Sequence, residues 1–229
     1  MTEFDRTVLE KAVRDGILEK VDGEKIVHDI NGEGQLIACS DGDQHDDMED
    51  HLHRKGLHRR HTILVAGGPL ALGPGSPARS LNSLFAEFVI YTTKDRKIGW
   101  FMRLLRPLLT LIGHLMRIDL FLLVQIFLGI TKKMMLVVIL MMHVPCAIAG
   151  DYHLDVVEQF KLVIGAKKRI KKKFTNNRVM LLIHVDWGND TRNTFRFSGE
   201  KTLEWISQNR NFFGILKAHL AAQTRLIPS

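Results

Sequence analysis

The chain has only two cysteines, and each of them follows a short apolar run. Cys39 ends the run 35–39, and Cys146 lies three residues after His143, which follows the run 134–142. Thiolate sulfur and imidazole nitrogen are ligands that zinc prefers, and catalytic zinc sites commonly combine three protein ligands with one open position. We therefore predict that Cys39, His143 and Cys146 bind one Zn²⁺ ion.

Asp41 lies two residues after Cys39 and adds a carboxylate to the predicted site. Zinc lowers the pKa of a bound water to about 7, which supplies hydroxide at neutral pH. Asp41 could accept a hydrogen bond from that hydroxide. It could instead bind the metal as a fourth ligand and close the site, and the residues alone leave both roles open.

Strand-like and helix-like segments alternate along the chain. Apolar runs predict buried strands at 35–39, 62–66, 134–142 and 179–185, with a short edge strand through Phe197. Helical patterns cover 44–58, 119–129, 154–174 and 200–220. This alternation predicts an α/β fold with a mostly parallel sheet of four to five strands, flanked by helices. Ligands of such sheets gather at the carboxyl ends of the strands, which would bring the predicted zinc ligands together.

A chain of 229 residues forms one large domain or two small ones. We predict a single α/β zinc-binding domain over residues 1–229. An amphipathic helix over 3–21 would belong to an N-terminal helical arm over 1–24, which could cover a second subunit. Two cysteines do not make a disulfide framework, and the first residues lack the layout of a signal peptide. These features favour a cytoplasmic protein with free thiols.

Charged residues interrupt the most apolar region, 107–142, and Asp119 among them would be costly in lipid. We therefore predict no stable membrane insertion. The net charge of +7 is concentrated in 54–60 and 167–173. We interpret both clusters as solvated helix faces, and no nucleic-acid-binding motif accompanies them.

Histidines and aspartates are concentrated within 45–61. A second metal site or a set of imidazoles that carry protons away from a zinc-bound water would fit this composition. We favour a solvated, mixed-charge surface helix. The residues are His45, Asp46, Asp47, Asp50, His51, His53, His58 and His61.

The pair of motifs Cys39-Ser40-Asp41 and His143-x-x-Cys146 resembles the β-class carbonic anhydrases. That family has Cys-x-Asp-x-Arg after one strand and His-x-x-Cys after a later one. Ala66, Gly67 and Gly68 after the second predicted strand are similar to the Ala-Gly element of the family and would line the substrate pocket. The order of elements matches over roughly residues 30–197.

The resemblance implies a zinc carbonate dehydratase, a lyase that reversibly hydrates CO₂ to bicarbonate. It implies a four-stranded parallel core and a homodimer or higher homo-oligomer with the site near the subunit interface. Cys39, His143 and Cys146 carry over as zinc ligands, and Asp41 carries over as the catalytic aspartate.

The chain departs from the family pattern at Asp43, where the family has an arginine that keeps the aspartate off the zinc. Arg59, Arg60 or Arg79 could replace that arginine in space. Ala147 and Met142 replace two glycines beside the ligands and add bulk there. Two alternatives stay open: a non-catalytic zinc-binding protein of the same fold, or a hydrolase of a related small substrate such as COS or CS₂.

Overall fold

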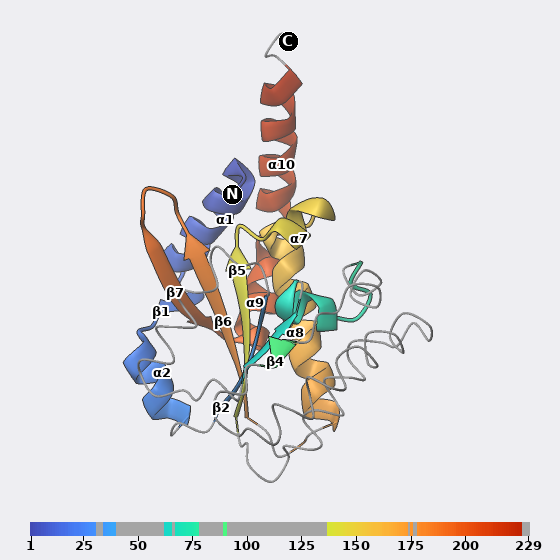
Figure 1. The fold of residues 1–229 in the computed structure, drawn as a ribbon. Coiled ribbons are helices and arrows are strands. Elements are labelled where there is room, and N and C mark those ends of the chain that lie inside the picture. Colours follow the sequence, from blue (N-terminus) through green and yellow to red (C-terminus); the bar gives the residue numbers. More distant parts are fainter. Residues whose placement is uncertain are drawn as a thin grey trace.

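The structure, a computed structural model, describes residues 1–30, 34–39, 62–65, 67–77, 89–90, 137–173, 175 and 178–225. Helices lie on both sides of one sheet (Figure 1). The strands are β1 (Leu18–Lys20), β2 (Gly34–Cys39), β3 (Thr62–Val65), β4 (Val89–Ile90), β5 (Val137–Val144), β6 (Arg178–Asp186) and β7 (Arg192–Phe197). The helices are α1 (Glu3–Arg14), α2 (Gly23–Ile30), α7 (Ala147–Asp151), α8 (Val156–Lys173), α9 (Gly199–Gln208) and α10 (Arg210–Arg225), with the short 3-10 helix η2 (Gly68–Leu72).

The seven strands form one sheet in the order β1-β7-β6-β5-β2-β3-β4. The central strands β6, β5, β2 and β3 are parallel neighbours. Strands β7, β1 and β4 pair antiparallel at the two sides of this group. The predicted α/β class is confirmed, but the sheet is mixed and has more strands than the four to five predicted. A short hairpin joins β6 to β7, and a hairpin can connect only antiparallel strands.

Strands β5 and β6 are buried on both faces. All of β5 is buried, and β6 is buried at every position except its two ends. Helix α8 covers one face, where its fully buried Phe160 meets the ring of Phe197 with centroids 5.1 Å apart. On the other face, Ile26 of α2 packs with Leu36 and Ile139. Burial on both faces explains why these strands read as continuous apolar runs.

The N-terminal segment differs from the predicted helix over 3–21. Helix α1 ends at Arg14, and the chain turns at Gly16 (φ +71°) into the edge strand β1. Helix α1 packs against α8 and α10 of its own chain, and the Asp5 carboxylate accepts a hydrogen bond from the Val156 backbone N–H (2.8 Å). The helical part of the predicted arm is therefore shorter, and its remainder joins the sheet.

The predicted helix over 200–220 is two helices. Helix α9 ends at Gln208 and is followed by Asn209, whose backbone N–H and side-chain amide both donate to the Trp205 carbonyl (3.0 and 2.9 Å). Helix α10 then begins at Arg210 and extends away from the sheet toward the C-terminus (Figure 1). An asparagine side chain that competes for a helical carbonyl is a common way to end a helix.

The remaining predicted strands lie in the sheet. The strands predicted at 35–39, 62–66, 134–142 and 179–185 correspond to β2, β3, β5 and β6, and the edge strand to β7. The helices predicted at 44–58 and 119–129 lie outside the described residues. Within the described part of the chain, no helix has both the length and the hydropathy that a membrane span requires.

Candidate metal centre

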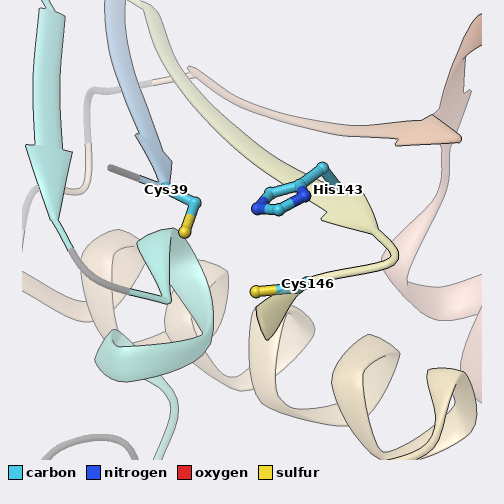
Figure 2. A group of neighbouring side chains, drawn as sticks. All are labelled: Cys39, His143 and Cys146. Atoms are coloured by element: carbon cyan, nitrogen blue, oxygen red, sulfur yellow. The ribbon is translucent and has the colours of Figure 1, made fainter. Parts of the chain in front are cut away.

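Two neighbouring parallel strands carry the three predicted zinc ligands to one edge of the sheet. Strand β2 ends at Cys39, and His143 is the penultimate residue of β5. A short turn through Pro145 then brings Cys146 to the N-terminal end of α7. Figure 2 shows that all three side chains point into one space beyond the strand ends. Their ligand atoms all lie within 4.8 Å of one another.

The three side chains form a donor set that suits zinc. Zn–S bonds of about 2.3 Å and Zn–N bonds of about 2.0–2.1 Å place tetrahedral donors about 3.5 Å apart. The ligand atoms therefore need to approach one another by only about 1 Å to enclose an ion. Cys39, His143 and Cys146 are 3%, 8% and 6% exposed, so the site is shielded from bulk water. The group is close enough to bind a metal ion, and its chemistry is compatible with zinc.

One hydrogen bond fixes the orientation of His143. Its Nδ1 lies 2.8 Å from the carbonyl oxygen of Pro145. A carbonyl only accepts, so Nδ1 must carry the proton and donate. When the ring is neutral, which is the form that binds a metal, its lone pair is on Nε2, the nitrogen on the side of the two sulfur atoms (Figure 2). A hydrogen bond from the ring nitrogen that does not bind the metal selects the tautomer of a metal-ligating histidine.

The same cluster favours the ionised form of Cys146. A hydrogen bond from Cys39 contributes most, followed by a hydrogen bond and the charge of His143 and by the backbone N–H of Ala149. These contacts outweigh burial and lower the pKa of the Cys146 thiol from 9.0 to about 5. Since a thiolate is the form that binds zinc, the site is prepared for a cation at neutral pH.

We expect the Cys146 thiolate of the metal-free protein to be protonated only near pH 5. The folded pKa lies below the ordinary value of 9.0, so this group stabilises the fold fully above pH 9, and that contribution is lost as the pH falls to about 5. An acid titration followed by thiolate ultraviolet absorbance, with Cys146→Ser as the blank, measures the midpoint. A midpoint near 9 would contradict the geometry described for this site.

Two glycines at the start of η2 allow the chain to pass close to Cys39. Gly67 and Gly68 both have positive φ angles, of 74° and 52°. A Cβ atom at Gly68 would lie 2.6 Å from the Cys39 backbone nitrogen, so only glycine fits against this end of β2. The C-terminal end of η2 is held by Arg169 of α8, which donates to the Leu72 carbonyl (2.7 Å). Gly67 and Gly68 therefore lie beside the metal centre, and their role in a substrate pocket stays a prediction.

Several predicted site residues lie outside the described residues. They are Asp41, Asp43, Ala66, the candidate arginines Arg59, Arg60 and Arg79, and the histidines and aspartates of 45–61. The choice between the two roles of Asp41 therefore stays open.

Sequence reasoning did not single out His184 as a site residue. It lies on β6 in register with His143 of β5 and is 6% exposed. Its Nδ1 is 3.1 Å from Oγ1 of Thr194 on β7. Burial, and then the charge of His143, lower the pKa of His184 to about 4, so the ring is neutral at pH 7. Aligning the apolar runs of β5 and β6 by their ends would have paired the two histidines.

No protein-family model, no curated protein and no solved structure matches this chain.

Proposed function

We propose that this protein is a zinc-dependent carbonic anhydrase that converts CO₂ and water reversibly to bicarbonate. The observation that carries the proposal is the meeting of Cys39, His143 and Cys146 within 4.8 Å at the carboxyl edge of parallel strands. Three donors leave one position of a tetrahedral zinc for a water molecule, which is the composition of a catalytic site. Bound zinc would lower the pKa of that water to about 7 and so make it a nucleophile at neutral pH.

The described residues would hold and tune the centre. Cys39 and Cys146 supply two sulfur ligands, and the hydrogen bond from His143 Nδ1 to Pro145 keeps Nε2 available for the metal. Burial of all three ligands limits competing water, which strengthens electrostatic interactions inside the site. Asp41 would orient the attacking water as a hydrogen-bond acceptor, a role taken from its place two residues after Cys39.

Two further features support carbonic anhydrase among zinc enzymes. The motifs Cys39-x-Asp41 and His143-x-x-Cys146 resemble those of the β-class carbonic anhydrases. Cys39 and His143 also lie on neighbouring parallel strands, β2 and β5, of a four-stranded parallel group, and Cys146 follows β5, an arrangement that the resemblance implies. On this proposal the protein forms a homodimer or a higher homo-oligomer, and CO₂ and bicarbonate are its small-molecule partners.

A non-catalytic zinc protein is the second candidate, and one sequence feature favours it. Asp43 occupies the position at which the family has the arginine that holds the aspartate away from the metal. Without that arginine, Asp41 would be able to take the fourth position and exclude water. A site closed by four protein ligands is the pattern of structural zinc.

Stopped-flow CO₂ hydration on zinc-quantified protein tests the proposal, measured at about pH 7 and at about pH 8.5. We expect hydration to scale with zinc content and to be abolished in Asp41→Asn, which keeps the size of the side chain and removes its charge. Activity seen only at the higher pH would indicate that Asp41 occupies the metal at neutral pH. Stoichiometric zinc with no hydration at either pH would overturn the proposal in favour of the second candidate or of a substrate such as COS or CS₂.

A further inference from the structure

Three polar side chains lie side by side across β5, β6 and β7. His143 pairs in register with His184, and His184 pairs in register with Thr194. Residues paired in this way direct their side chains to the same face of a sheet. The row therefore begins at a metal ligand and continues over the two strands beside it.

The hydrogen bond to Thr194 determines the direction of the His184 ring. Its Nδ1 faces Thr194 on β7, at 3.1 Å. The two nitrogens of an imidazole point in largely opposite directions, and β6 lies between β7 and β5. The Nε2 atom of His184 is therefore directed away from β7, toward β5 and the side on which His143 lies.

The Nε2 atom of His184 is buried and has no hydrogen-bond partner among the described residues. The whole side chain is only 6% exposed. Buried polar atoms in proteins nearly always have a partner, so one without a partner beside a candidate metal centre indicates a place for a ligand. The Thr194 hydroxyl can donate to Nδ1, and in that tautomer Nε2 carries a proton that it can donate.

We propose that His184, on the strand beside that of His143, binds a ligand of the metal centre. The Nε2–H group of His184 donates a hydrogen bond to an oxygen of a small oxyanion bound beside His143. The inference rests on the proposed function, because the anion needs an open position on the metal. It names bicarbonate, the product of CO₂ hydration, as the oxyanion. It also assigns Thr194 the task of holding the ring in the tautomer that donates.

Anion binding to the cobalt-substituted protein tests this role without measuring turnover. The visible spectrum of cobalt reports both metal occupancy and the arrival of an anion. Bicarbonate and iodide are the two probes, because bicarbonate accepts a strong hydrogen bond and iodide accepts only a weak one. The test variant is His184→Asn, whose amide can replace Nδ1 toward Thr194 and cannot replace Nε2. The rescue variant is His184→Gln, whose amide reaches the position of Nε2.

We expect His184→Asn to bind cobalt normally and to lose at least about tenfold in bicarbonate affinity, since a hydrogen bond to a charged group is lost. Iodide affinity should stay at the parent value, and His184→Gln should recover most of the bicarbonate affinity. His28→Asn, an exposed histidine on α2, is the matched control and should change neither affinity.

Different outcomes separate this inference from the proposed function. Equal bicarbonate affinity in the parent and in His184→Asn would overturn the role of His184. Loss of cobalt itself from His184→Asn would also overturn it, because His184 would then support the ligand set. A cobalt protein that binds neither anion would overturn the open metal position on which the proposed function depends. Bicarbonate binding that depends on His184 in a protein without CO₂ hydration would support the oxyanion contact and reject the activity.

Discussion

Replacing Cys146 with serine is expected to remove zinc from the protein. Cys146 supplies one of the three ligand atoms that meet within 4.8 Å. A serine hydroxyl is of similar size, yet it stays protonated at neutral pH and is a poor ligand for zinc. Loss of a group that hydrogen-bonds to a metal ligand already lowers metal affinity by up to about a hundredfold, so loss of a ligand should lower it by more than about a hundredfold. Metal analysis after dialysis should find about one zinc per parent chain and a background level in the variant.

Stability measurements give a second readout of the same substitution. A metal that binds only the folded state stabilises it by about 4 kcal/mol at a thousand times its Kd. Zinc should therefore raise the Tm of the parent and leave that of Cys146→Ser unchanged. A chelator should bring the parent close to the variant. His28→Ala, on the exposed part of α2, serves as the control and should keep its zinc. Stoichiometric zinc in Cys146→Ser would show that this cysteine is not a ligand.

Replacing Gly68 with alanine is expected to destabilise the fold and to weaken zinc binding together. At φ +52° an alanine is strained by about 1–2 kcal/mol. Its Cβ would also lie 2.6 Å from the Cys39 nitrogen and 2.9 Å from the Ala38 carbonyl carbon. These are backbone atoms of β2, which cannot rotate away as a side chain can. Overpacking of this kind adds about 1–3 kcal/mol and should displace Cys39 from the metal.

Gly75 provides the matched control for this substitution. An alanine at its φ of +70° would have a backbone strain similar to that at position 68, but its Cβ atom would meet nothing within 4 Å among the described residues. The free energy of unfolding of Gly75→Ala should therefore fall by only about 1–2 kcal/mol, the penalty for a left-handed non-glycine residue. It should also keep full zinc affinity. Urea unfolding and zinc titration of both variants separate strain from steric contact. Equal losses at the two glycines would mean that the contact with Cys39 is unimportant.

The central strands and the meeting of the three candidate ligands followed from local patterns in the sequence. The runs that became β2, β5 and β6 are apolar because strands in the middle of a parallel group are buried on both faces. Residues just after such strands gather at one edge of the sheet, so the positions of Cys39, His143 and Cys146 along the chain were enough to predict that they meet. The pattern slightly misplaced the end of β5, which continues through His143 to Val144.

Other features were decided by partners distant in the sequence. The edge strand β1 has only three residues, and its identity comes from pairing with β7. A helical period continues through this segment, and Asp15-Gly16 is the one local turn signal that separates it from α1. The break at Asn209 likewise depends on one side chain bonding back to Trp205. Tertiary context overrides local propensity most easily in short elements, because their intrinsic preferences sum to little.

The sequence by itself determined which residues can bind zinc, since only two cysteines exist, one at the end of a buried strand and one just after another. The tertiary structure decided what surrounds them. It turns Nδ1 of His143 toward the Pro145 carbonyl, brings Gly68 against the backbone of Cys39, and places His184 beside His143. Each of these contacts depends on the register between strands or on a close approach of two backbone segments. Such contacts join residues that lie far apart along the chain or depend on the path of a turn, and the order of residue types alone does not specify them.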